Sequence, residues 1–186
     1  MTPKKTSAST YVALLRGINV GGKHKLPMKE LVEVCSATQC SNVRTYIQSG
    51  NVVFTAPVNV AKGLALTLAK NIEERFGFPV PVVLRSHEQL AQVARSNPFL
   101  KAGKPESTLH VLFLADEPTA EAIAKLDPNR SPADQFRVFG SEIYMHFPNG
   151  MGNSKLTSAY FDSRLATVGT ARNWATVLKL VEMSQP

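Results

Sequence analysis

The sequence is poor in the residue types that define a metal site, a disulfide scaffold or a membrane protein. It has 2 cysteines and 4 scattered histidines in 186 residues, too few for a disulfide framework or a Cys/His structural zinc site. No apolar run approaches the roughly 20 residues that cross a bilayer, and the first ten residues lack the hydrophobic core of an export signal. We therefore expect a cytoplasmic protein with no metal, no cofactor and no membrane partner.

Acidic residues are outnumbered by basic ones. The chain has 14 Asp+Glu against 21 Lys+Arg, a formal net charge of +7, which favours partners that carry phosphate or other acidic groups. A hydrophobic content of 44% with 19% charged residues is typical of a globular protein. The length suits one large domain or two small ones. Composition selects neither a reaction nor an oligomeric state, so monomer and homodimer both stay open.

The pattern of the first half predicts the order βαββαβ. Strands are expected at residues 11–15, 43–47, 52–54 and 80–84, and helices at residues 28–38 and 64–76. This is the order of the ferredoxin-like fold. The first and last of these strands are apolar at every position, so both faces of the sheet should be covered, by the second half or by a second subunit. Pro81 places the last strand at an edge.

A similar order begins again after residue 85. Helices are expected at residues 87–95, 119–126, 154–164 and 172–183, and strands at residues 109–114, 136–139 and 143–147. The fold class is therefore α+β, with a ferredoxin-like βαββαβ first half packed with a second, incomplete ferredoxin-like half. The expected divisions are a mobile leader over residues 1–10, a ferredoxin-like subdomain over 11–85, and an α+β subdomain with C-terminal helices over 86–186. Residues 97–108 are the best linker candidate.

The loop after the first strand is the first candidate site. Residues 16–25 form a longer connection than the two to six residues usual between a strand and a helix. Glycines allow backbone amides to turn toward a ligand, and the next helix presents its positive end. An anion is the expected guest, and the alternative is a glycine-permitted turn with solvated lysines. The candidate ligand-binding residues here are Arg16, Gly17, Asn19, Gly21, Gly22 and Lys23, with Lys25 and His24 beside them.

Two further basic stretches precede expected helices. The first contains Gly150, Gly152, Ser154 and Lys155; Ser154 could cap a helix, and the spacing does not match a phosphate-binding loop of nucleoside triphosphatases. The second contains Thr170, Arg172 and Asn173. Thr170 is the expected cap there, and Arg172 in a first helical turn would oppose the helix dipole unless an anion lay beside it. A single site requires all three stretches to converge.

None of the three stretches contains Asp or Glu, so they hold neither a carboxylate pair for acid/base catalysis nor a magnesium-binding carboxylate. The leading hypothesis is a protein that binds a phosphate-bearing small ligand, nucleotide-like or smaller. One alternative is nucleic-acid binding through a basic surface. Another is a phosphoryl- or acyl-phosphate hydrolase, in which Arg16 or Lys23 stabilises the anion and Asn19 or Asn51 positions water. Whether any reaction is catalysed stays open.

Four motifs resemble the bacterial domain-of-unknown-function family 1697. They are residues 11–22 (YVALLRGINVGG), 42–54 (NVRTYIQSGNVVF), 150–156 (GMGNSKL) and 170–174 (TARNW). The resemblance covers nearly the whole chain. It implies an α+β fold with ferredoxin-like elements, and it carries no established activity and no catalytic residues.

The resemblance also draws attention to the turn between the second and third strands. Gln48, Ser49 and Asn51 are a second candidate site, with a plain hairpin turn as the alternative. We expect this hairpin at the opposite end of a ferredoxin-like sheet from the 16–25 loop. The two motifs would then form separate sites unless the long loop folds back.

Overall fold

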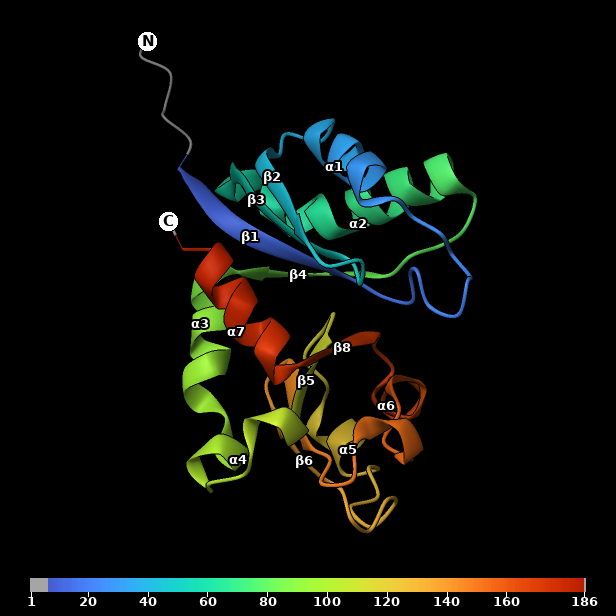
Figure 1. Ribbon diagram of the computed structural model, residues 1–186, viewed down its shortest axis with the longest axis vertical. Helices are drawn as coiled ribbons and strands as arrows, with labels where there is room; N and C mark the ends of the chain where they lie inside the picture. Colours follow the sequence, from blue (N-terminus) through green and yellow to red (C-terminus); the bar gives the residue numbers. More distant parts are fainter. Residues whose placement is uncertain (1–6, 186) are drawn as a thin grey trace. The chain divides into compact units, whose positions relative to one another are not determined.

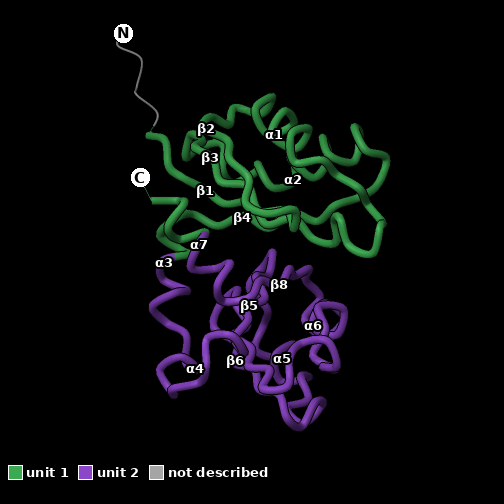
Figure 2. Tube along the Cα trace, in the orientation of Figure 1, with its two compact units in different colours: residues 1–90, 180–186 green, residues 91–179 purple. Residues whose placement is uncertain are grey.

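The computed structural model describes residues 7–185, and the chain divides into two compact units (Figure 2). Unit 1 comprises Met1–Leu90 and Leu180–Pro186, and unit 2 comprises Ala91–Lys179. Each unit contains a four-stranded antiparallel sheet. The expected α+β class with ferredoxin-like elements is confirmed.

Unit 1 has the predicted βαββαβ order. Its elements are β1 (Ala8–Leu15), α1 (Met28–Ser36), β2 (Ser41–Tyr46), β3 (Asn51–Pro57), α2 (Val58–Phe76) and β4 (Val82–Ser86) (Figure 1). The strands lie in the order β2-β3-β1-β4, so β4 is an edge strand as Pro81 predicts. Strand β1 begins at Ala8, opposite Pro57, which makes residues 8–10 part of the sheet; residues 1–6 of the expected leader lie outside the described residues.

The core of unit 1 lies between the sheet and the two helices α1 and α2, which lie together on one side of it (Figure 1). Strand β1 sends Ala13 and Leu15 into this core, where they join Leu31 and Leu68. Its alternate residues point to the other face, and Leu14 among them is also fully buried. Both faces of the strand are therefore covered, as its unbroken apolar run indicates.

Both cysteines belong to this core. Cys35 and Cys40 are free and buried, and burial raises the pKa of the Cys35 thiol to about 12. Cys35 therefore stays a neutral thiol at physiological pH, which suits packing and not nucleophilic chemistry.

Unit 2 repeats the same sheet. Its strands are β5 (Leu109–Leu114), β6 (Gln135–Phe139), β7 (Glu142–His146) and β8 (Gly169–Asn173), in the order β6-β7-β5-β8. Its helices are α4 (Pro98–Lys101), α5 (Ala120–Ile123) and α6 (Ser158–Leu165), with 3-10 turns at Glu106–Thr108 and Met151–Asn153. Helices α3 (His87–Ser96) and α7 (Trp174–Met183) each contribute to both units. The expected linker at 97–108 thus contains a helix, which the Asn97 side chain caps by accepting from the Phe99 N–H at 3.0 Å.

The second ferredoxin-like half is complete, which corrects the expectation of an incomplete one. The missing fourth strand is β8, which pairs with β5 so that Gly169 lies opposite Leu114 and Arg172 opposite Val111. The predicted helix over 172–183 therefore began two residues too early. Gly169 contributes no side chain, and Thr170, Arg172 and Asn173 are polar, so this strand lacks the apolar alternation that marks a strand in a sequence.

The two units share a backbone register as well as an order. The Leu15 N–H donates to the Gly50 carbonyl at 2.8 Å in unit 1, and the Leu114 N–H donates to the Ser141 carbonyl at 2.8 Å in unit 2. Each fourth strand also carries a buried arginine at the same register position. These are Arg85, opposite Val12, and Arg172, opposite Val111, and each donates from Nη1 to the carbonyl of the preceding residue at 2.8 Å. The units are two versions of one module.

Two histidines of the second sheet predict that acid destabilises the protein. Burial lowers the pKa of His110 and His146 below the ordinary value of 6.5, and the charge of Lys104 lowers that of His146 further. The unfolded chain therefore binds protons more readily than the folded one. The free energy of unfolding should be at its full value above about pH 6.5 and should fall as the pH drops toward about 5.

Urea unfolding at pH 8 and pH 5 measures this effect. The double variant His110→Gln/His146→Gln should lose less stability between the two pH values than the parent protein. Comparing each protein with itself removes any constant cost of the substitutions. An equal loss in both proteins would show that other groups cause the acid sensitivity.

Candidate functional site

The 16–25 loop and the β2–β3 hairpin meet at the same end of the first sheet. Strands β1 and β3 are antiparallel, with Leu14 opposite Asn51, so the end of β1 lies beside the start of β3. The hairpin comes immediately before β3, and the Leu15 N–H donates to the Gly50 carbonyl at 2.8 Å. The expectation of two opposite ends was therefore wrong, because it overlooked that β1 and β3 run in opposite directions.

The side chain of Asn19 joins the two loops. Its Nδ2 donates to the Leu26 carbonyl at 2.9 Å and to the Gln48 carbonyl at 3.0 Å, and its Oδ1 accepts from the Leu26 N–H at 2.8 Å. Both donors of the amide are engaged by backbone. Asn19 is therefore a structural brace of the site, and its amide has no donor left to position a water molecule.

Asn51 has a similar structural role in the hairpin. It is fully buried, and its Nδ2 donates to the Tyr46 carbonyl at 3.1 Å and to Ser49 Oγ at 2.9 Å. These two hydrogen bonds hold the turn between Tyr46 and Asn51 in a fixed conformation. The water-positioning role considered for Asn51 is unsupported for the same reason as that of Asn19.

The two loops and the start of α1 line an open pocket of about 620 Å³. Its lining residues are Asn19, Gly22, Lys25, Leu26, Pro27, Met28, Lys29 and Gln48. Lys25 and Lys29 supply positive charge, and the exposed Pro27 and half-buried Met28 supply apolar surface, whereas Leu26 is buried in the core. Pro27 is the N-cap of α1 and provides no side-chain cap, so the first-turn amides of the helix depend on water or a ligand for partners.

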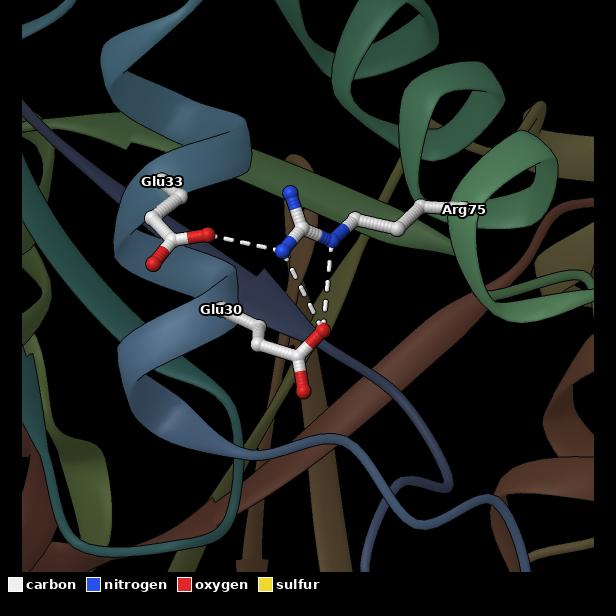
Figure 3. Close-up of polar contacts among 3 residues, drawn as sticks. All are labelled: Glu30, Glu33 and Arg75. Atoms are coloured by element: carbon white, nitrogen blue, oxygen red, sulfur yellow. Dashed lines mark hydrogen bonds and ion pairs between the residues drawn. The ribbon is translucent and has the colours of Figure 1, made fainter.

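An ion-pair triad beside the pocket offsets the acidic charge of α1. Arg75 of α2 lies 2.7 Å from Glu33 and 3.2 Å from Glu30 (Figure 3). The hydrogen bonds that Arg75 donates to Glu33 and Glu30 raise the pKa of Arg75, so the guanidinium stays charged. Glu30 lies in the first turn of α1, where its carboxylate would repel an anion if Arg75 did not neutralise it.

The rest of the 16–25 loop is folded tightly on itself. Gly17, Gly21 and Gly22 all have positive φ angles, of 70°, 58° and 75°, which confirms why glycine is needed there. The Lys23 N–H donates to the Val20 carbonyl at 3.1 Å and closes a short turn whose side chains are exposed. Arg16 is half-buried, and its backbone N–H donates to the Pro81 carbonyl at 3.0 Å.

His24 is fixed beside this loop. Its ring stacks on Phe78 at 4.7 Å between centroids, and its Nδ1 is 3.1 Å from the Gly17 carbonyl. Stacking on Phe78 and the contact with the Gly17 carbonyl are enough to explain where the His24 ring lies, without a functional role.

The stretch from Gly150 to Lys155 is a loop of unit 2 and does not begin a helix. Ser154 caps nothing helical, because its Oγ accepts from the Leu156 N–H at 3.0 Å in a local turn. Helix α6 begins later, with Thr157 as its cap. The backbone of Lys155 is held by a hydrogen bond, which its carbonyl accepts from Arg130 Nε at 3.1 Å. Gly150 has a φ of 80°, and Gly152 lies in the 3-10 turn that follows.

The stretch from Thr170 to Asn173 is a strand, which removes the argument from the helix dipole. Arg172 is only 8% exposed and donates from Nη1 to Thr170 Oγ1 at 2.8 Å. Burial lowers the pKa of Arg172 to about 10, so it stays charged at neutral pH. The helix cap is Asn173, whose Oδ1 accepts from the Thr176 N–H at 2.8 Å, and not Thr170.

The candidate residues therefore fall into two groups. Asn19, Gly22 and Gln48, taken from the two sequence motifs of the first half, line one pocket. Lys155 and Arg172 belong to unit 2. The Lys155 carbonyl is bonded to Arg130 there, and the Arg172 guanidinium is bonded to Thr170. Sequence reasoning missed Met28 and Lys29 as lining residues, although Pro27 at a helix start was a usable signal because it leaves the following amides uncapped.

Within residues 7–185, no group of three or more His, Cys, Asp or Glu side chains is placed to hold a metal ion. No helix in the same range is long and apolar enough to cross a membrane.

Comparison with known proteins gives a family and a fold. The model of the family described as "Protein of unknown function (DUF1697)" matches residues 8–144. No curated protein matches the chain. Among solved structures, the chain is similar to the conserved bacterial protein SP0830 from Streptococcus pneumoniae, with 24% identity and a TM-score of 0.72 over 96% of this chain and 100% of that one. That likeness supports the fold.

Proposed function

Since the chain belongs to the DUF1697 family of proteins of unknown function, whose model matches residues 8–144, we propose from its own geometry that it binds the phosphate group of a small cytoplasmic ligand. The observation that carries this proposal is the pocket of about 620 Å³, where Lys25 and Lys29 meet the uncapped start of α1. Two cations and a set of backbone amides are suitable partners for a phosphate.

The pocket is also held in place before any ligand arrives. Asn19 fixes both its loops by three hydrogen bonds, and Arg75 neutralises the nearby Glu30. A site with fixed partners loses little conformational entropy on binding. This arrangement supports binding of a defined small molecule more than diffuse attraction to a basic surface.

Titration with pyrophosphate tests the proposal. We expect the double variant Lys25→Gln/Lys29→Gln to bind pyrophosphate at least about tenfold more weakly, since two charged partners are lost and tenfold corresponds to about 1.4 kcal/mol. Isothermal titration calorimetry at low and high salt measures the affinity. The matched control is Lys62→Gln, which removes an exposed charge from α2 of the same unit and should leave the affinity unchanged.

A thermal-shift panel widens the test to inorganic phosphate, sugar phosphates, nucleotides and short RNA or DNA. A shift with a small phosphate compound that survives high salt supports the pocket. A shift only with polynucleotide, abolished by salt, would favour a basic nucleic-acid surface instead. In the calorimetric titration, an equal loss of pyrophosphate affinity in Lys25→Gln/Lys29→Gln and in Lys62→Gln would also contradict the proposal.

A further inference from the structure

The pocket is larger and more apolar than a phosphate group requires. A volume of about 620 Å³ lies in the range of sites that hold organic ligands. Its apolar surface comes from Pro27 and Met28, because Leu26, which precedes them, is only 1% exposed and belongs to the core. Pro27 is exposed and Met28 is half-buried, so these two residues present apolar surface to the pocket. A phosphate group gains no favourable contact from apolar surface, whereas a flat organic ring can pack against it.

Gln48 supplies a neutral polar group on the hairpin side of the same pocket. Its carbonyl is fixed by Asn19 at 3.0 Å, and the residue is exposed and lines the pocket. A glutamine amide offers donors and an acceptor together, which matches the polar edge of a heterocyclic ring and not a phosphate. The pocket thus combines cations, apolar surface and an amide.

The residue before Gln48 has an unusual backbone. Ile47 has a φ of 47°, a left-handed conformation that is strained for a β-branched residue, and its side chain is 52% exposed. The strain is maintained by the hairpin bonds on either side, from Asn51 to Tyr46 and from Asn19 to Gln48. This conformation fixes the direction in which Gln48 leaves the turn, so Ile47 is a positioning residue for it.

We propose that the ligand is a phosphate monoester whose organic part is a flat ring system of nucleoside size. The ring lies against Pro27 and Met28, and the Gln48 amide binds its polar edge. This inference rests on the proposed function, because the phosphate end is held by Lys25, Lys29 and the start of α1. Gln48 is then the residue that selects among phosphate esters.

Calorimetry with a series of phosphates tests this assignment. The series comprises inorganic phosphate, glycerol phosphate, phenyl phosphate and the nucleoside monophosphates. We expect the tightest nucleoside monophosphate to bind at least about tenfold more strongly than glycerol phosphate, with phenyl phosphate between them. Gln48→Ala should weaken that nucleoside monophosphate about fivefold or more and leave inorganic phosphate unchanged, since it removes the contact to the ring alone. The control, Gln135→Ala, changes an exposed glutamine of β6 in unit 2 and should alter neither affinity.

A second variant keeps the test decisive if Gln48→Ala folds poorly. Ile47→Gly accepts the positive φ without strain but frees the turn, so it should weaken the nucleoside monophosphate and spare inorganic phosphate. Equal affinity for all esters, or an equal effect of Gln48→Ala on both ligands, would overturn this inference while the phosphate site stands. Absence of binding by every small phosphate would overturn the proposed function itself, and binding of polynucleotide alone with loss at high salt would overturn both.

Discussion

Alanine at position 50 is expected to lower the free energy of unfolding by about 2–4 kcal/mol, because it combines a left-handed backbone with a steric clash. Gly50 has a φ of 79°, and a Cβ there would lie 2.6 Å from the Cβ of Leu15 and 3.0 Å from Cδ1 of Ile18. Both neighbours are buried, and Leu15 belongs to the central strand β1. The clash therefore requires movement of a strand, and not of a flexible side chain.

Gly77→Ala separates the two contributions. Gly77 ends α2 with a φ of 77°, and a Cβ there would meet nothing within 4 Å. It should cost only the left-handed strain, about 1 kcal/mol. Urea unfolding of both variants at pH 8 measures the difference. Equal losses at the two positions would show that the hairpin yields to the added methyl group without cost.

Gly50 also connects stability to the site. Its carbonyl accepts from the Leu15 N–H at 2.8 Å, the contact that brings the hairpin beside the 16–25 loop. Displacing Gly50 should therefore disturb the pocket lined by Gln48 and Asn19. We expect any residual pyrophosphate binding in Gly50→Ala to be weaker than in Gly77→Ala.

The first sheet was predictable because its signals are local. The apolar run at 11–15, the Ser49–Gly50 turn and Gly77 at the end of α2 each act within a few residues. Strand β8 was missed because its burial depends on a distant partner. Gly169 lies so close to Leu112 that a Cβ would be 2.9 Å from its side chain, a constraint that the local sequence does not contain.

The site was predictable in its parts and not in their arrangement. Both loops stand out by their glycines, but the bonds that join them link Asn19 to residues 7 and 29 positions away. Sequence periodicity gives no information on such contacts. The apolar surface of the pocket was missed for a related reason, since Met28 packs partly against the core and looks like an ordinary core residue in a sequence.

The duplicated module explains why one unit carries the proposed site. The loop after β1 is long and basic, whereas the equivalent loop after β5 is short and contains Asp116 and Glu117. Asp116 has a structural role within unit 2, because its Oδ2 accepts a hydrogen bond from Thr167 Oγ1 at 3.3 Å. The shared backbone register thus supports two different loops, and only the loop of unit 1 has the charge that an anion needs.

Asn19→Ala should be the most damaging substitution within the site. It removes three hydrogen bonds to backbone groups, each with a net value of about 0.5–1.5 kcal/mol, and it places alanine at a φ of 55°. We expect a loss of about 2–4 kcal/mol in the free energy of unfolding. Urea unfolding measures the loss, and faster hydrogen exchange at the Leu26 amide reports the broken contact.

Asn19→Gly distinguishes the brace from the backbone strain. Glycine accepts the positive φ of 55° but has no amide to hold Leu26 and Gln48, so it should be more stable than Asn19→Ala and bind pyrophosphate equally poorly. Both variants should lose at least about tenfold in affinity, about 1.4 kcal/mol, because the two loops no longer hold the pocket open. If Asn19→Gly kept the parent affinity, the brace would be needed for folding alone. Weak binding by both variants, despite their different stabilities, would show that the amide of Asn19 organises the anion site.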